Sequence, residues 1–354
     1  AVGRSETEEV THPSGIRYAH ATSPVNGEGW EIEVTDATTS SFARSATAGD
    51  YFALMKPRVM SLVIFTGLAG LLAAPGYVDP VLGFSILLAI AAGAGGAGAL
   101  NMWYDADIDA RMARTRARPV PAGRVSPQEA LGMGMTMSIL SVLLMALASG
   151  LFAAALLAFT IFFYAVVYTM GLKRRTPENI VIGGLSGALP PAIAWAAKTG
   201  GLTLDPLLLV AIIFFWTPPH FWSLALYQKG DYAAAGVPML PVTHGAAETR
   251  KRVLLYSLLL IPLCLAPAFT GLGGAIYAAV AALGGALFLV LATRVARSRA
   301  GEKDGGGDLY AVARGDKAAR DLFAFSILYL ALLFAALIVE HGAGVYWPLN
   351  ALLR

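Results

Sequence analysis

Apolar residues fill most of the chain in long stretches, which are separated by glycine, proline and short charged segments. A stretch of about 20 apolar residues is long enough to cross the hydrocarbon core of a bilayer as a helix. The pattern therefore predicts an all-α integral membrane protein with nine transmembrane helices. The predicted spans cover residues 59–75, 81–101, 131–149, 151–169, 179–198, 205–222, 253–270, 274–293 and 321–340.

The N-terminal segment has a different pattern. Residues 1–50 contain no long apolar stretch and are rich in serine, threonine, glutamate, glycine and alanine. They show neither the basic region and apolar core of a signal peptide nor the arginine-rich, acid-poor composition of a transit peptide. We therefore expect a mostly disordered extension over 1–50, followed by a membrane domain over 51–354.

Composition supports the membrane interpretation. Of the 354 residues, 56% are hydrophobic and only 14% are charged, whereas a soluble domain carries about 25% charged residues. Too few polar side chains remain to cover a water-facing surface. The net charge of +3 gives no reason to expect nucleic acid as a partner. The single cysteine, Cys264, excludes an internal disulfide and a multi-cysteine metal site.

Basic residues are distributed unevenly between the predicted loops. If the N-terminal segment is cytoplasmic, 24 of the 26 lysines and arginines fall in cytoplasmic segments, and only Lys198 and Arg354 fall outside. Cytoplasmic loops of membrane proteins collect lysine and arginine. This distribution predicts a cytoplasmic N-terminus and a periplasmic C-terminus, and it places the long polar loops on the cytoplasmic side.

The second predicted span ends in a regular acidic motif, Asn101-Met-Trp-Tyr-Asp105-Ala-Asp-Ile-Asp109. Residues four apart on a helix are turned by only about 40°, so Asn101, Asp105 and Asp109 share one face. Two carboxylates placed in this way can hold Mg²⁺, which in turn binds the phosphates of a substrate. Asp107 is out of phase, and we expect it to be solvated surface. A polar helix end leaving the membrane is the alternative, but three polar residues in phase favour function.

Basic residues and a further carboxylate lie on the same predicted side of the membrane. Arg114 and Arg118 follow the first motif directly, and Lys173 and Arg174 follow the fourth predicted span. Arginine pairs with phosphate oxygens through its planar fork, although any cytoplasmic loop also collects arginines. Asp231 follows the sixth span and would face the first motif. The two clusters together predict a metal–diphosphate site.

These motifs resemble those of the UbiA superfamily of intramembrane prenyltransferases. The shared pattern is N-x-x-x-D-x-x-x-D over Asn101–Asp109, followed by R-T-x-x-R-P. The segments Leu172–Gly184, Pro218–Trp222 and Asp231–Pro241 are similar to the branch that acts on heme, and the resemblance covers residues 50–340. Many superfamily members carry a second aspartate where this chain has Tyr227, so the number of metal ions stays open.

The resemblance implies a nine-helix UbiA-type bundle in the bacterial inner membrane, with its active site toward the cytoplasm. It implies Mg²⁺-dependent transfer of a farnesyl group from farnesyl diphosphate to a vinyl group of heme B, with addition of water to give heme O. Membrane lipid, heme A synthase and oxidase assembly proteins are the further partners expected. The catalytic and metal-binding residues expected are Asp105, Asp109 and Asp231. The residues expected to bind substrate are Asn101, Arg114, Arg118, Lys173, Arg174, His220, Tyr227 and Lys229.

His220 is the candidate for contact with heme. It lies in Pro218-Pro-His-Phe-Trp222 at the predicted end of the sixth span, ahead of Asp231. Three roles are open for it: a ligand of the iron, a hydrogen-bond partner of a propionate, or a structural residue that holds the Pro-Pro turn.

Three rival functions also remain open. One is a UbiA-type prenyltransferase that acts on an aromatic or quinone precursor. Another is a secondary transporter, although transporters place charged residues near the middle of their spans and this chain gathers them at one interface. The third is a non-catalytic assembly factor of a heme oxidase, which would not need Asp105 and Asp109 in phase.

Overall fold

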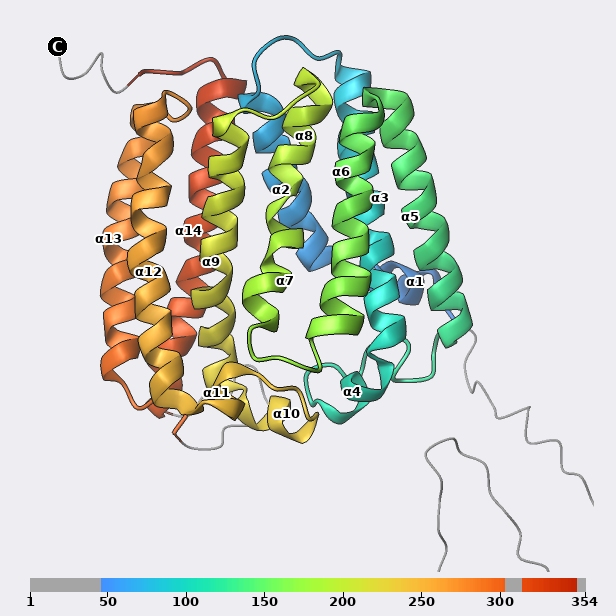
Figure 1. Cartoon of the computed structure of the whole chain (residues 1–354), viewed down its shortest axis with the longest axis vertical. Coiled ribbons are helices and arrows are strands. Elements are labelled where there is room, and N and C mark those ends of the chain that lie inside the picture. The colour runs from blue at the N-terminus through green and yellow to red at the C-terminus, as the bar shows by residue number, and fades with distance from the viewer. Residues whose placement is uncertain (1–45, 303–313, 349–354) are drawn as a thin grey trace, which may run out of the picture. The chain divides into compact units, whose positions relative to one another are not determined.

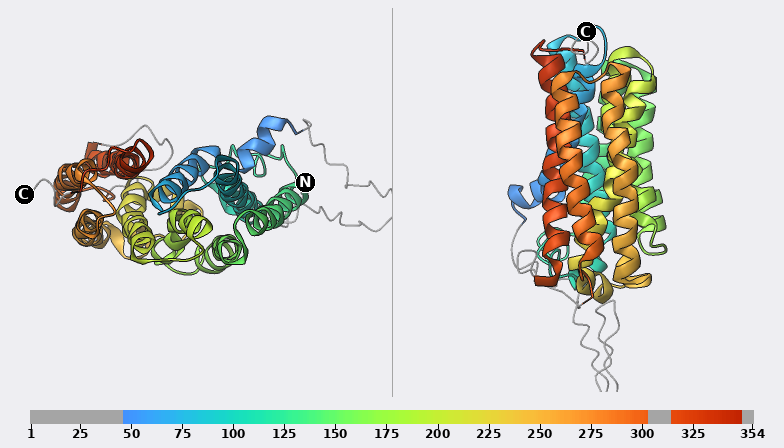
Figure 2. Two further views of the ribbon diagram at one scale, coloured as in Figure 1. Left: turned by 90° about the horizontal axis from the view of Figure 1, so that it is seen from above. Right: turned by 90° about the vertical axis from the view of Figure 1, so that its left-hand side faces the viewer.

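The computed structural model describes residues 46–302 and 314–348, and these ranges contain helices and loops without a β-strand. The long helices are α2 (Pro57–Ala73), α3 (Pro80–Tyr104), α5 (Pro127–Ser149), α6 (Leu151–Phe162), α9 (Leu204–Tyr227), α12 (Gly245–Thr270), α13 (Ala275–Arg297) and α14 (Lys317–Gly342). The shorter helices are α1 (Ala48–Leu54), α4 (Ala106–Arg111), η1 (Phe163–Leu172), α7 (Asn179–Ala188), α8 (Pro190–Thr199), α10 (Lys229–Ala234), α11 (Leu240–Thr243) and η2 (Arg314–Asp316). The long helices lie side by side with their axes roughly aligned (Figures 1 and 2).

The membrane fold predicted from the apolar pattern is confirmed. Within the described ranges, eight helical segments are long and apolar enough to cross a membrane. The first predicted span lies in α2, which reaches this criterion only together with α1, across a bend of 54°. The described residues therefore contain eight candidate spans, or nine if the bent pair counts as one. The exact number and the sides of the membrane on which the termini lie stay predictions.

Local sequence signals fix where the helices begin. Asp79 caps α3, because its Oδ1 accepts hydrogen bonds from the backbone N–H groups of Val81 at 2.9 Å and Leu82 at 3.3 Å. Ser126 and Glu129 form a capping box at the start of α5. Both helices have proline as their first residue, where the missing N–H has no intrahelical partner to lose.

Small residues allow α3 and α5 to pack closely. A Cβ atom on Gly96 would lie only 3.0 Å from the carbonyl oxygen of Gly134 and 2.9 Å from the backbone nitrogen of Ser138. A side chain at Gly96 would therefore push the two backbones apart. Close approach of this kind stabilises helix pairs in lipid, where the hydrophobic effect between helices is weak.

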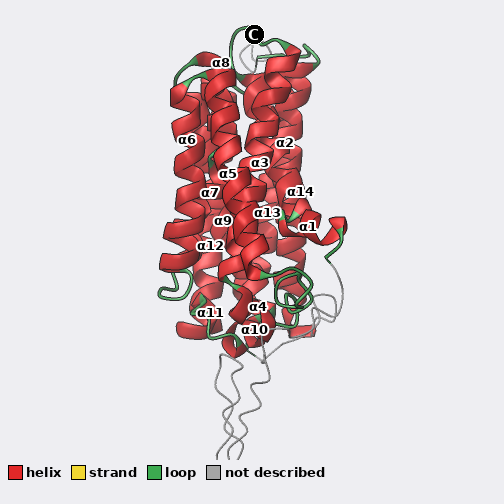
Figure 3. Cartoon of the chain, turned by 90° about the vertical axis from the view of Figure 1, so that its right-hand side faces the viewer, coloured by secondary structure: helices red, strands yellow, loops and turns green. Residues whose placement is uncertain are grey.

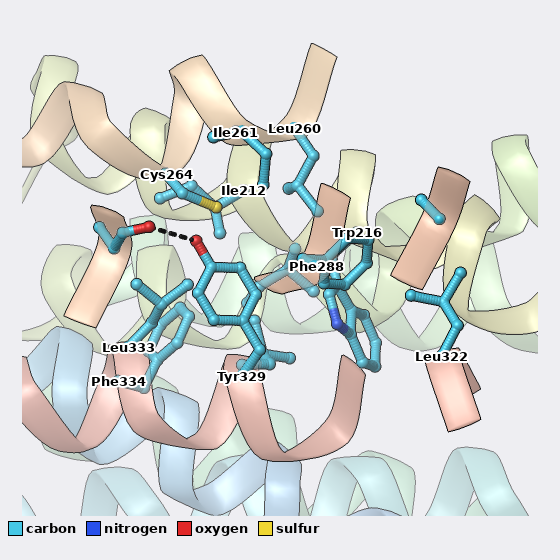
Figure 4. Packing of buried hydrophobic residues seen from close by; sticks show 14 of the residues in the cluster. Ile212, Trp216, Leu260, Ile261, Cys264, Phe288, Leu322, Tyr329, Leu333 and Phe334 are labelled. Carbon is cyan, nitrogen blue, oxygen red and sulfur yellow. Dashed lines mark hydrogen bonds between the residues drawn. The ribbon is translucent and has the colours of Figure 1, made fainter. Parts of the chain in front are cut away.

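The largest apolar core lies between α9, α12, α13 and α14, and Figure 4 shows part of it. Phe288 and Tyr329 pack together there with a ring separation of 5.6 Å, and the hydroxyl of Tyr329 donates to the carbonyl of Ala281 at 3.1 Å. The indole N–H of Trp216 donates to the carbonyl of Ser326 at 2.8 Å. Cys264 is buried in the same core and forms no disulfide.

The two ends of the helices differ in character. The short helices α4, α10 and α11 lie together at one end (Figures 1 and 3), where α4 carries Asp109 and α10 carries Asp231. At the other end, Lys198 donates to the carbonyls of Leu71 at 3.1 Å and Ala74 at 2.7 Å. Lys198 thus satisfies carbonyls at the C-terminal end of α2 and stabilises that helix end.

Two predicted boundaries differ from the structure. Helix α9 continues through Pro218 and Pro219 to Tyr227, so the predicted end of the sixth span at residue 222 is wrong. Two hydroxyl groups of this stretch bond the carbonyl four residues back: Thr217 donates to Ile213 O at 2.8 Å, and Ser223 donates to Pro219 O at 2.6 Å. Helix α1 begins at Ala48, inside the last residues of the predicted extension, while residues 1–45 lie outside the described residues.

Candidate active site

The first acidic motif lies where α3 passes into α4, and its three in-phase residues are buried. Exposed fractions are 3% for Asn101, 0% for Asp105 and 2% for Asp109. Helix α3 ends at Tyr104, but the backbone N–H of Asp105 still bonds Asn101 O, and that of Asp109 bonds Asp105 O. This continued i, i+4 pattern keeps the residues on one side despite the helix break, as the spacing predicts.

The side chain of Asn101 is the centre of a complete hydrogen-bond network. Its Nδ2 donates to Asp105 Oδ2 at 2.7 Å and to Thr169 Oγ1 at 2.9 Å, and its Oδ1 accepts from the ammonium of Lys56. Asp105 can only accept, and Lys56 can only donate. The neighbours therefore fix which end of the amide is oxygen and which is nitrogen.

Asp105 is held by a basic side chain from the loop after η1. Lys173 forms an ion pair with Asp105 Oδ2, and Arg174 Nη2 lies 3.7 Å from Asp105 Oδ1. Arg174 bonds Asp107 more closely, at 2.6 and 2.8 Å, and its guanidinium lies 4.8 Å from the ring centre of Tyr104. The hydrogen bonds that Arg174 donates to the Asp107 carboxylate raise the pKa of the Arg174 guanidinium. Asp107 is exposed as predicted, yet it is also the main anionic partner of Arg174.

Asp109 is paired within its own loop. Arg118 Nη1 donates to Asp109 Oδ2 at 2.5 Å, and the hydroxyl of Thr115 donates to the carbonyl of Asp109 at 2.9 Å. Helix α4 ends at Arg111, and Met112 is extended, so Arg114 and Arg118 do not lie on a continuation of this helix. The loop folds back instead and brings Arg118 onto the carboxylate.

Asp231 joins the second motif to the loop of the first. It lies in α10, is 7% exposed, and its Oδ2 accepts from the backbone N–H of Arg114 at 3.4 Å. Tyr227, the last residue of α9, is buried with its ring edge-on to Phe323 at 6.1 Å. Lys229 begins α10 and is half-buried. The two predicted motifs are therefore in contact at one end of the helices.

The fit of the site to a metal ion depends on its carboxylates. Among the residues that the structure describes, no three carboxylate, histidine or cysteine side chains form a group that could hold a metal ion. In this arrangement Asp105 and Asp109 contact basic side chains instead. However, Asp105 Oδ1 is buried and has no hydrogen-bond partner. A buried carboxylate oxygen in that condition is suited to bind Mg²⁺, which prefers oxygen ligands.

His220 packs against α14. Its ring stacks between Trp216 and Phe323, with ring separations of 4.2 and 4.6 Å, and its Nδ1 lies 2.7 Å from Ser326 Oγ. Ser326 donates its own hydroxyl proton to the carbonyl of Phe323, so Nδ1 is the ring nitrogen that donates. Of the three roles considered, this geometry favours the structural one. This structural role differs from the predicted one. His220 does not hold a Pro-Pro turn, because α9 continues through Pro218 and Pro219; it packs α9 against α14.

An apolar pocket adjoins the polar cluster. Lys56 and Tyr164 are among the polar residues that line it, and much of its wall is apolar, including Val63, Ile90 and Ile193. The pocket lies between α2, α3, α6 and the α7–α8 segment, and it shares Lys56 with the network around Asn101. A charged site therefore lies next to a space suited to a hydrocarbon chain.

Two residues of the network were missed from the sequence. Lys56 was counted only among the basic residues that predict the orientation in the membrane, and Thr169 was assigned to the fourth predicted span. Lys56 adopts a left-handed conformation, with φ 54°, between α1 and Pro57. A lysine before proline at the start of an apolar span was the only available signal. Thr169 gave none, because its contact with Asn101 depends on how two distant helices pack.

Comparison with known proteins identifies the class. The chain matches the UbiA prenyltransferase family over residues 62–306. The chain therefore belongs to the UbiA prenyltransferase family.

Similarity to individual proteins is more specific. The chain is 64% identical over 304 residues to a protoheme IX farnesyltransferase of Maricaulis maris, and the match covers 85% of this chain and 92% of the relative. It is 63% identical over 305 residues to a protoheme IX farnesyltransferase of Caulobacter vibrioides, which covers 84% and 92%.

Solved structures share the fold. A digeranylgeranylglyceryl phosphate synthase structure has a TM-score of 0.65 at 17% identity, covering 82% of this chain and 97% of that chain. A UbiA homolog from Archaeoglobus fulgidus, bound to GPP and Mg²⁺, has a TM-score of 0.55 at 17% identity, covering 81% and 99%. At this identity the likeness supports the helical fold alone.

Proposed function

We propose that the chain transfers a farnesyl group from farnesyl diphosphate to a vinyl group of heme B, and that water adds to give heme O. The high identity to protoheme IX farnesyltransferases over nearly their whole length supports this reaction. The structural observation that carries it is the buried cluster of Asn101, Asp105 and Asp109, which adjoins an apolar pocket. This arrangement offers separate places for a diphosphate and for its hydrocarbon chain.

The carboxylates are the groups that we propose to hold the metal. Asp105 and Asp109, with Asp231 in the neighbouring helix α10, would bind Mg²⁺, which when bound stabilises the negative charge that develops on the leaving diphosphate. Asn101 orients Asp105 through its amide. The orphaned Oδ1 of Asp105 supports this assignment. The use of Mg²⁺ by a UbiA homolog of the same fold is consistent with it.

The basic residues are proposed to change partners when substrate binds. Lys173 and Arg118 neutralise Asp105 and Asp109 in this arrangement, and their side chains are 17% and 25% exposed. Both can turn from a carboxylate to a diphosphate oxygen without losing an ionic partner. Arg114 in the loop after α4 and Lys229 at the start of α10 would add positive charge. Arg174 is better placed to support the loop through Asp107.

The apolar pocket is proposed to take the isoprenoid chain. Breaking the C–O bond of farnesyl diphosphate gives an allylic cation, which water would capture at once if it could reach C1. A wall of apolar side chains excludes water, and the face of Tyr164 can stabilise a nearby cation. The cation then bonds the terminal carbon of the heme vinyl group. Water adds to the inner vinyl carbon and loses a proton, which completes the hydroxyl-bearing product.

The topology and location are also proposals. The distribution of basic residues supports a cytoplasmic position for the motif-bearing end, so we propose a bacterial inner-membrane protein with a cytoplasmic N-terminus and a periplasmic C-terminus. Cysteine labelling can test this cleanly, because the native Cys264 is buried. Substituted cysteines in the 112–126 loop should react only with reagents that cross the membrane. Labelling of that loop by an impermeant reagent from the periplasm would reverse the orientation. The extension over 1–50 and the assembly partners stay predictions.

The reaction can be tested directly. Membranes containing the protein are incubated with heme B, Mg²⁺ and farnesyl diphosphate, and the extracted heme is analysed by mass spectrometry. A heme heavier by a hydroxyfarnesyl unit is expected, and it should be absent when farnesyl diphosphate is omitted. Unchanged heme in the presence of a folded protein would contradict the proposal.

A further inference from the structure

The segment that carries Lys173 toward Asp105 is a π-helix. Helix α6 changes at Phe163 into η1, which runs over Phe163–Leu172 with i→i+5 hydrogen bonding. Such segments are rare, and many occur at functional sites. This one lies directly before Lys173 and opposite the first acidic motif.

The π winding changes which residues share a face. In an α-helix at 100° per residue, Thr169 would lie about 140° from Tyr164, and Lys173 about 180° from it. In a π-helix the hydrogen bond joins residues five apart. Thr169 therefore lies on the same face as Tyr164, and Lys173 returns to that face after roughly two turns. The contacts agree: Thr169 reaches Asn101, Lys173 reaches Asp105, and the ring centre of Tyr164 lies 6.0 Å from Lys56 Nζ.

The hydroxyl of Thr169 reports the altered winding. Thr160, in the adjoining α6, and Thr293 each bond the carbonyl four residues back, as is usual in an α-helix. Thr169 instead donates to the carbonyl of Tyr164, five residues back, at 2.8 Å. Its single proton is thereby used, so its oxygen accepts from Asn101 Nδ2. Thr169 is fully buried, so no water replaces this contact.

From these contacts we infer that η1 sets the register between the acidic motif and the apolar pocket, and that Thr169 is the positioning residue that couples them. Thr169 holds one Nδ2 proton of Asn101, which directs the other to Asp105 and leaves Oδ1 for Lys56. One face of η1 thus supports the residues that hold diphosphate and lines the pocket through Tyr164. The inference rests on the proposed function, because it assigns the cluster to a diphosphate.

Binding of an unreactive donor can separate this inference from the proposed reaction. The probe is farnesyl thiodiphosphate with Mg²⁺, titrated calorimetrically into the purified full-length protein, and no heme is required. Thr169→Val should weaken binding about tenfold, because it removes the hydroxyl but keeps the shape. Thr169→Ser should restore binding. Thr293→Val is the matched control, since that hydroxyl bonds only its own helix, and it should bind as the parent does.

Coupling to Asn101 provides the second readout. If Thr169 acts through Asn101, the double variant Thr169→Val/Asn101→Ala should bind no more weakly than Asn101→Ala alone. Additive losses, or binding by Thr169→Val equal to that of the parent, would overturn the inference. A drop in thermal midpoint for Thr169→Val that Thr169→Ser shares would indicate a packing role and would overturn it too. Failure of the parent protein to bind the probe would instead refute the proposed donor.

Discussion

Two regions of the molecule bury carboxylates in different ways. Near the C-terminal end of α14, Glu340 is fully buried and accepts from the backbone N–H groups of Gly274 at 2.7 Å and Tyr277 at 2.9 Å. At the opposite end of the helices, Asp105 is equally buried, but its partners are the side chains of Asn101 and Lys173. Glu340 caps the start of α13, whereas Asp105 has one oxygen without a hydrogen-bond partner.

The difference distinguishes contacts that stabilise the fold from contacts that a bound anion can replace. A backbone N–H cannot turn away, so the bonds of Glu340 stabilise the helix end and change little. Side chains such as Lys173 can rotate toward a new anion, and a buried ion pair adds little net stability because desolvation opposes it. We therefore expect the same chemical change, carboxylate to amide, to reduce activity at one end and stability at the other.

The largest effect is expected at the acidic motif. Asp105→Asn and Asp109→Asn should each reduce turnover at least about a hundredfold, because the metal loses a ligand and the leaving diphosphate loses its stabilisation. The variants should still insert and fold, which a thermal midpoint in detergent would show. Turnover within a few-fold of the parent would place the metal elsewhere.

A smaller loss of activity is expected from the arginine that pairs with Asp109. Arg118→Lys keeps the charge but loses the planar fork, and turnover should fall about tenfold. Arg116→Lys, at an exposed position in the same loop, is the matched control and should have little effect. If both variants are fully active, these arginines serve orientation in the membrane only.

At the other end, the change should appear in stability. Glu340→Gln places an amide N–H against one of the two backbone donors and should cost about 2 kcal/mol of unfolding free energy. The thermal midpoint should fall, while turnover per folded molecule stays unchanged. Loss of turnover without loss of stability would remove the distinction between the two regions.

The smallest effect is expected at Asp107. Its side chain is 56% exposed, and an exposed ion pair contributes less than about 1 kcal/mol. Asp107→Asn should therefore change turnover by less than about threefold, through a looser Arg174. Assays of this variant beside Asp105→Asn test the phase argument, and equal losses in the two would break it.

Much of the fold could be predicted because the bilayer imposes simple rules. Apolar length located the membrane helices, although α5 begins at Pro127, after its cap Ser126, and not at the predicted residue 131. The end of α9 was predicted too early because Pro218 and Pro219 suggested a turn. A helix in a membrane bundle can continue through proline, and the hydropathy pattern does not show where it does so.

The candidate site was only partly predictable. The spacing of Asn101, Asp105 and Asp109 indicated a shared face, and the structure buries them together. The contributions of Lys56 and Thr169 could not be found, since they depend on tertiary packing and on the π winding of η1. If the segment were read as an α-helix, Thr169 and Lys173 would be assigned to the wrong face.

The most direct test of the central claim is a competition between acceptors. The purified protein is given farnesyl diphosphate and Mg²⁺ with heme B and an aromatic acid prenyl acceptor together, and both products are measured by mass spectrometry. We predict a hydroxyfarnesyl heme as the product, which disappears with EDTA and in Asp105→Asn but persists in Asp107→Asn. A prenylated aromatic acid with unchanged heme, or a heme product that is insensitive to both EDTA and Asp105→Asn, would contradict the account.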